Sequence, residues 1–74
     1  MDERIREILA NVFEVAVSEI NADSSPDTIE KWDSLKHMHM ILALEEEFGV
    51  MFDEDEIMNM ITVELICLTL KEKL

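Results

Sequence analysis

The sequence predicts an all-α fold, a four-helix bundle with a long loop between the first two helices and a short third helix. Apolar residues recur at helical spacing in several segments, and clusters of turn and breaker residues separate those segments. The 74 residues allow one small domain, residues 1–74, because a chain of this length builds only a single modest core.

The first helix is expected from about Asp2 to Val17. The acids Asp2 and Glu3 suit the positive end of a helix dipole. Apolar side chains at helical spacing form its expected core face: Ile5, Leu9, Val12, Phe13 and Ala16. We interpret this helix as a core element with no chemistry of its own.

From Ser18 to Trp32 the helical periodicity stops, and turn residues gather in the middle of the segment. A connection this long is unusual in a compact domain, so apolar residues must hold it against the bundle. The expected anchors are Ile20, Ile29 and Trp32. Trp32 has two interpretations: it packs the loop onto the bundle, which we favour, or it contacts a bound group or partner.

The second helix is expected from Ser34 to Phe48, between an N-cap at Asp33 and a left-handed residue at Gly49. Ser34 is then the first helical residue. Free backbone N–H groups and the helix dipole would stabilise an anion on its hydroxyl oxygen. The sequence therefore predicts Ser34 as a place to carry a phosphate ester.

The second helix has more apolar surface than one core contact requires. One stripe is expected to face the core: Met40, Ile41, Leu44 and Phe48, with His37 at its edge. A second stripe lies well round the helix: Leu35, Met38 and Leu42, extended by Glu45 and Glu46 and bordered by Lys36 and His39. Two stripes indicate a fully buried helix or a helix that binds a partner. The glutamates favour the partner, but a solvated helix face explains them equally well.

A short third helix is expected to begin at the acidic run that starts with Asp53 and Glu54. Asp53 and Glu56 have capping-box spacing. The apolar residues that follow are Met58, Met60 and Ile61. They suit either ordinary core filling, which we favour slightly, or a deformable wall around a variable ligand.

The last helix is expected from about Val63 to Lys73, with Thr62 as its N-cap. Its inward or edge positions are Leu65, Ile66, Leu68, Thr69 and Leu70. Cys67 is the only cysteine, which excludes an internal disulfide, and it is expected to be a small buried hydrophobe.

Eighteen acidic and six basic residues give a net charge of −12. Nucleic acid and anionic membranes are therefore not expected as partners, whereas proteins with basic patches are. No uncharged run is long enough to span a bilayer, and the first residues lack a secretory signal pattern. We expect a cytoplasmic protein without membrane insertion.

An autonomous enzyme is not expected. Ser34 and His37 can touch on one helix, but no orienting group or oxyanion donors can be identified for them. His37 and His39 make a poor metal pair, because residues two apart point to different faces of a helix. No metal site is predicted.

The triplet Asp33-Ser34-Leu35, followed by a helix that ends Leu44-Glu45-Glu46-Glu47-Phe48-Gly49, resembles the acyl carrier protein family. The resemblance covers almost the whole chain. It implies that a separate transferase esterifies Ser34 with 4′-phosphopantetheine from coenzyme A, with Asp33 and Leu35 as the flanks of the motif. The thiol of that arm would hold an acyl or aminoacyl group as a thioester, and the chain would be a non-catalytic cosubstrate of other enzymes.

The partners implied by this resemblance are a phosphopantetheinyl transferase and the enzymes that load, condense and transfer acyl or aminoacyl groups. We expect a monomer that presents one docking surface to them. The expected docking residues are Leu35, Lys36, Met38, His39, Leu42, Glu45, Glu46, Asp53 and Glu54.

Two positions depart from the pattern of many fatty-acid carriers, which are acidic where this chain has Lys36 and His39. The family also often has a glycine and a small or aliphatic residue where this chain has Lys31 and Trp32. We therefore expect a specialised carrier, in lipid, polyketide or aminoacyl chemistry, over a general one in fatty-acid biosynthesis. The alternatives are an acidic helical interaction module with an unmodified Ser34 and, least favoured, a small hydrolytic or metal-dependent enzyme.

Overall fold

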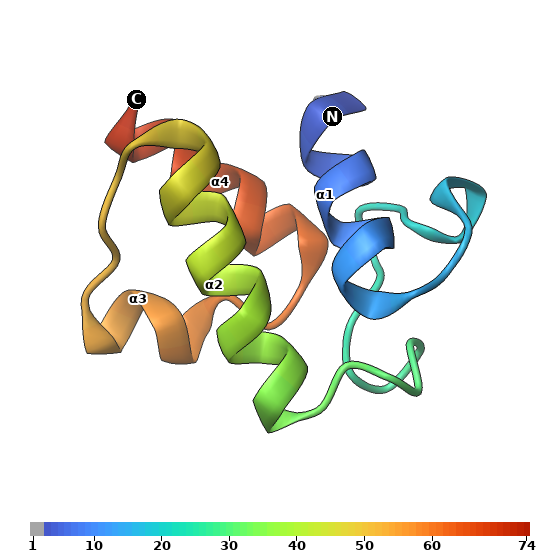
Figure 1. Ribbon diagram of the computed structural model, residues 1–74. Coiled ribbons are helices and arrows are strands. Elements are labelled where there is room, and N and C mark those ends of the chain that lie inside the picture. Colours follow the sequence, from blue (N-terminus) through green and yellow to red (C-terminus); the bar gives the residue numbers. More distant parts are fainter. Residues whose placement is uncertain (1–2) are drawn as a thin grey trace.

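The computed structural model describes residues 3–74, which form four α-helices and one 3₁₀ turn. These elements are α1 (Glu3–Phe13), η1 (Val17–Glu19), α2 (Ser34–Phe48), α3 (Glu54–Asn59) and α4 (Val63–Lys73). Figure 1 shows the long connection before α2 on one side of the molecule and the short α3 on the other. No strand forms within the described residues, and the predicted four-helix architecture is confirmed. None of these helices is both long enough and apolar enough to cross a membrane.

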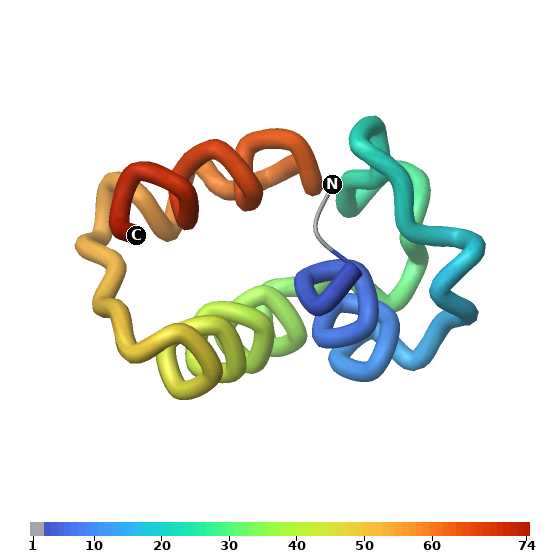
Figure 2. Tube along the Cα trace, turned by 90° about the horizontal axis from the view of Figure 1, so that it is seen from above, coloured from blue at the N-terminus to red at the C-terminus, as the bar shows by residue number. Residues whose placement is uncertain are grey.

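The core is built from the inner faces of α1, α2 and α4 and from the loops that join them. Figure 2 shows α2 and α4 on opposite sides of the bundle, with α1 near one end. Side chains with no exposed surface come from each of these helices and from the residue after α3: Leu9, Phe13, Met40, Leu44, Met60, Val63, Ile66 and Leu70. Their burial is the main source of stability in so small a domain.

Helix α1 ends four residues before the end that we expected, at Phe13 and not at Val17. Glu14 adopts a left-handed backbone conformation, with φ of 58°, and the N–H of Val15 donates to the carbonyl of Ala10 at 3.0 Å. This is the geometry of a helix C-terminus, although glycine usually occupies the left-handed position. The expected core residue Ala16 is therefore outside the helix and exposed. The expected start at Asp2 lies outside the described residues.

The long loop is held by the predicted anchors Ile20, Ile29 and Trp32, which are all buried. Its backbone also serves α4, because the carbonyls of Ala22 and Ser24 accept the first N–H groups of that helix, from Glu64 and Val63. These N–H groups have no acceptor within α4 itself. The loop is thus part of the bundle and caps one of its helices.

The predicted caps of the last three helices are confirmed. Asp33, Asp53 and Thr62 each accept a hydrogen bond from a backbone N–H three residues later, and Glu56 completes the capping box with Asp53. Gly49 ends α2 with φ of 65°.

Several apolar side chains after α2 are more exposed than we expected. Met60 is buried, but Met58 and Ile61 are 73% and 51% exposed, so core filling holds for one residue of the three. Leu68 is 52% exposed and not packed inward, and Cys67 is only half-buried. In α4 the buried stripe is narrow and consists of Val63, Ile66 and Leu70, which leaves Leu68 outside it.

Candidate functional site

Ser34 is the first residue of α2, and its side chain is exposed at the end of the helix where backbone N–H groups point outward. Asp33 before it has an extended backbone, and its Oδ1 accepts the N–H of Lys36 at 2.8 Å. The Asp33 carbonyl accepts the N–H of His37, also at 2.8 Å, which is the first turn of the helix. These two hydrogen bonds fix the first turn of α2 and therefore the position of the Ser34 side chain at its start.

Within the described residues, no side chain or carbonyl accepts the N–H of Ser34 or of Leu35. Two unused donors therefore stand at the positive end of a 15-residue helix, beside the Ser34 hydroxyl. A phosphate ester on Ser34 needs such donors for its anionic oxygens. The residues present fit the covalently attached phosphate end of a phosphopantetheine group.

His37 does not activate Ser34 in this structure. Its Nδ1 accepts the indole N–H of Trp32 at 3.0 Å, and its Nε2 lies 2.7 Å from the carbonyl oxygen of Ile57. Both ring nitrogens are therefore engaged, and neither is free to take the Ser34 proton. Ser34 and His37 therefore do not form a nucleophile–base pair in this structure.

Trp32 packs the long loop onto the bundle, as the favoured interpretation held. It is 3% exposed and stacks on Phe13 of α1 with ring centroids 4.6 Å apart. Its indole N–H donates a hydrogen bond to His37, so both the stacked ring and the N–H group of Trp32 are held in place. Trp32 positions the chain that leads into Ser34 and does not line an exposed surface.

The second stripe of α2 remains uncovered. Leu35, Met38 and Leu42 are 64%, 44% and 58% exposed, which excludes the alternative of a fully buried helix. His39 and Glu46, beside this stripe, are also exposed. Together these five side chains, Leu35, Met38, His39, Leu42 and Glu46, form what we call the α2 outer face.

The structure gives internal contacts to three of the expected docking residues. Lys36 is 3.2 Å from the Glu14 carboxylate, Glu45 accepts the N–H of Phe52 at 2.9 Å, and Asp53 caps α3. These side chains therefore stabilise the fold whatever they do for a partner. Glu54, in the first turn of α3, is exposed.

Glu14 is a residue near the site that our sequence analysis missed. Its carboxylate contacts Lys36 at 3.2 Å and Lys31 at 3.9 Å, and so links the end of α1 to the segment around Ser34. The hydrogen bond from Lys36, with the charges of Lys36 and Lys31, holds the pKa of Glu14 below its ordinary value. No local signal marks Glu14, because its lysine partners are distant in the sequence.

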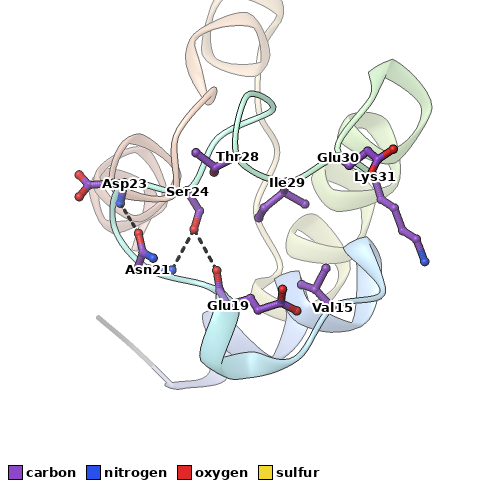
Figure 3. Close-up of a pocket in the computed structure, with 9 residues that line it drawn as sticks. All are labelled: Val15, Glu19, Asn21, Asp23, Ser24, Thr28, Ile29, Glu30 and Lys31. Atoms are coloured by element: carbon purple, nitrogen blue, oxygen red, sulfur yellow. Dashed lines mark hydrogen bonds between the residues drawn. The ribbon is translucent and has the colours of Figure 1, made fainter.

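A pocket lies in the long loop, away from Ser34. Its volume is about 660 Å³, and Figure 3 shows its lining side chains from the loop and the end of α1. Ser24 is buried at its wall, where its hydroxyl accepts the N–H of Asn21 and donates to the carbonyl of Glu19. The lining contains no residue of α2.

The chain was compared with known families, sequences and structures. A family model described as a phosphopantetheine attachment site matches residues 3–70, a range that contains Ser34 and His37. An acyl carrier protein of Petrotoga mobilis is 33% identical over 72 residues, which are 97% of this chain and 85% of that relative. The acyl carrier protein 3 of Ralstonia nicotianae is 34% identical over 62 residues, which are 84% of this chain and 71% of that relative.

The fold has a solved counterpart. The solution structure of a holo acyl carrier protein from Geobacter metallireducens matches with a TM-score of 0.86 and 25% identity. The match covers 96% of this chain and 82% of that structure, so it includes the long loop and the short third helix as well as the three longer ones.

Proposed function

This chain belongs to the acyl carrier protein family, whose prosthetic group is covalent 4′-phosphopantetheine, and we propose that Ser34 is its attachment residue. The observation that carries the proposal is the pair of unused N–H donors beside an exposed hydroxyl at the start of α2. The residues on either side of Ser34, Asp33 and Leu35, have different structural roles. Asp33 caps the helix, and Leu35 lies on the exposed α2 outer face.

The other serines of the chain lack this environment. Ser24 is buried and its hydroxyl is engaged in two hydrogen bonds, while the Ser25 hydroxyl accepts the N–H of Asp27. Ser18 is exposed, but it lies within the three-residue η1 and not at the start of an α-helix. Ser34 is therefore the best acceptor, and Ser18 is the natural control.

The attachment reaction is a phosphoryl transfer. The Ser34 oxygen forms a bond to the phosphorus that bears pantetheine, and the pyrophosphate bond of coenzyme A breaks. Adenosine 3′,5′-bisphosphate leaves, and the hydroxyl proton passes to a base of the transferase, because this chain offers none at Ser34. The new phosphodiester then lies beside the free N–H groups of Ser34 and Leu35. When bound, the arm supplies a thiol that holds an acyl group as a thioester.

Intact-mass measurement tests the attachment residue. The chain is incubated with coenzyme A, magnesium and a broad-specificity phosphopantetheinyl transferase, beside the Ser34→Ala and Ser18→Ala variants. We expect one phosphopantetheine on the parent and on Ser18→Ala, and none on Ser34→Ala. No addition to folded parent by several transferases would instead support the acidic interaction module.

We further propose that the chain serves a specialised lipid, polyketide or aminoacyl pathway. His39 lies on the exposed α2 outer face, and Lys36 stands in the first turn beside it, where many fatty-acid carriers are acidic. A partner whose surface is strongly basic would meet a less negative helix here than on those carriers. The partner set of this chain is therefore expected to differ from theirs.

The charge of these two positions can be restored to test this. The Lys36→Asp/His39→Glu double variant should be a better substrate for enzymes of fatty-acid synthesis than the parent, chiefly through faster association. Because Lys36 is paired with Glu14, the single His39→Glu variant separates surface charge from loss of that ion pair. No gain in rate for either variant would contradict the specialised assignment.

A further inference from the structure

The His37 ring connects three parts of the bundle through two hydrogen bonds. The indole N–H of Trp32 donates to Nδ1 at 3.0 Å, and Nε2 lies 2.7 Å from the Ile57 carbonyl. We call these two bonds the His37 bridge. Trp32 belongs to the long loop, His37 to the turn of α2 that follows Ser34, and Ile57 to α3.

The partners of the bridge dictate one form of the imidazole. An indole N–H can only donate, so Nδ1 must carry a lone pair. A carbonyl oxygen can only accept, so Nε2 must carry the hydrogen. The bridge therefore requires the neutral ring in its Nε2–H tautomer, because a proton on Nδ1 would oppose two donors at 3.0 Å.

Helix α3 depends on contacts of this polar kind. None of its six residues is fully buried, and Ile57 packs against the core as a partly buried side chain. Its other tethers are the capping box of Asp53 and Glu56 and an ion pair between Glu56 and Lys73 of α4 at 2.7 Å. The His37 bridge joins α3 to the first turn of α2.

The charged groups around the bridge are paired elsewhere. Asp33 caps α2, and Lys36 of α2 contacts Glu14, which follows α1. On α3 and α4, Glu56 and Lys73 contact each other. Among residues 3–74 no carboxylate contacts the His37 ring, so none of these contacts would replace the bond to Trp32 if the ring became charged.

We propose that His37 is a positioning residue for Ser34 and that protonation of its ring opens the His37 bridge. This extends the proposed function, because Ser34 lies one turn before His37 on α2. Loss of the bond to Trp32 would remove the polar contact that orients the indole just before Ser34, although the ring stays stacked on Phe13. Presentation of Ser34 to its transferase would then decline when the His37 ring carries a second proton.

Trp32 is the only tryptophan and therefore reports on the bridge directly. Its indole N–H gives a single resonance in a ¹H–¹⁵N spectrum. When acidification protonates the His37 ring, we expect this resonance to shift and its exchange with water to accelerate. The parent should show this change, and so should the His39→Gln variant, which removes an exposed histidine on the same helix. The His37→Gln variant should not.

The tautomer of the His37 ring in the parent tests the proposal even if the His37→Gln variant folds poorly. The ¹⁵N shifts of the neutral His37 ring in the parent must report the Nε2–H tautomer, and the opposite tautomer would overturn the proposal. A transition of the indole that persists in folded His37→Gln, or that vanishes in His39→Gln, would overturn it too.

The link to Ser34 is tested by the rate of transferase modification. The ratio of the parent rate to the His37→Gln rate should fall as the pH is lowered, and the pH dependence of the transferase itself cancels in this ratio. A constant ratio would refute the positioning role. Failure of the proposed attachment would appear differently, as the absence of modification in both proteins at every pH.

Discussion

Replacement of Asp33 by alanine tests how much this residue stabilises the fold, apart from any contact that it makes with the transferase. The change removes the carboxylate oxygen that accepts the N–H of Lys36 at 2.8 Å, and it leaves the backbone of α2 intact. Loss of such an N-cap costs about 1 kcal/mol, within a range of about 0.5–2 kcal/mol. In a domain of this size, that corresponds to a fall in melting temperature of about 4–8 °C.

Removal of one negative charge acts in the opposite direction, because a net charge of −12 opposes the compact state. The matched control is Asp27→Ala, which removes an acid from the exposed part of the long loop where no side-chain bond is at stake. The difference between the two variants isolates the cap. The Asp33→Asn variant completes the set, because asparagine caps a helix about as well as aspartate without its charge.

The assay is urea unfolding followed by circular dichroism, with transferase modification measured on the same samples. We expect Asp33→Asn to match the parent in stability and Asp33→Ala to fall below Asp27→Ala by about 1 kcal/mol. If Asp33→Ala unfolds at the same urea concentration as Asp27→Ala, the capping argument is wrong. If Asp33→Asn is as stable as the parent but is not modified, the carboxylate is read by the transferase and is more than a cap.

Two further predictions concern the ends of helices. The free energy of unfolding of the Gly49→Ala variant, measured in urea, should be lower than that of the parent by about 1 kcal/mol, because a φ of 65° strains a residue with a Cβ. The Gly49→Asn variant should lose less, since asparagine tolerates this conformation better. The added Cβ would meet no atom within 4 Å, so a much larger loss would contradict a purely backbone cause. Lys73 holds the pKa of Glu56 below the ordinary value of 4.5, so the ion pair stabilises the fold above that pH and loses its effect as the pH falls. The stability advantage of the parent over Glu56→Gln should therefore shrink in acid, and an advantage that grew in acid would refute this assignment.

The elements that the sequence predicted well are those whose determinants are local. Asp33, Asp53 and Thr62 each cap a helix through a bond to an N–H three residues later, and Gly49 ends α2 by its own backbone preference. Each of these signals can be read from a few adjacent residues. The position of Ser34 at a helix start followed directly from one of them.

The end of α1 was not predictable in this way. Glutamate has no preference for the left-handed conformation, and apolar residues continue at helical spacing past it. The helix ends at Phe13 in a structure where the Glu14 carboxylate reaches Lys31 and Lys36, which are far along the chain. The His37 bridge has the same character, since periodicity places His37 at the edge of the core but does not reveal Trp32 and Ile57 as its partners.

The hydrophobic effect and electrostatic repulsion act in opposite directions on the exposed α2 outer face. Leu35, Met38 and Leu42 favour removal from water, whereas a net charge of −12 on each copy opposes contact between copies. A partner with a basic rim around an apolar patch satisfies both forces, because its charges attract the chain and its patch covers the three side chains. Self-association would bury the three apolar side chains but would bring two negatively charged copies together. Salt shortens the range of that repulsion. From the acidic composition we therefore expect this face to bind other proteins in preference to nucleic acid or to its own copies.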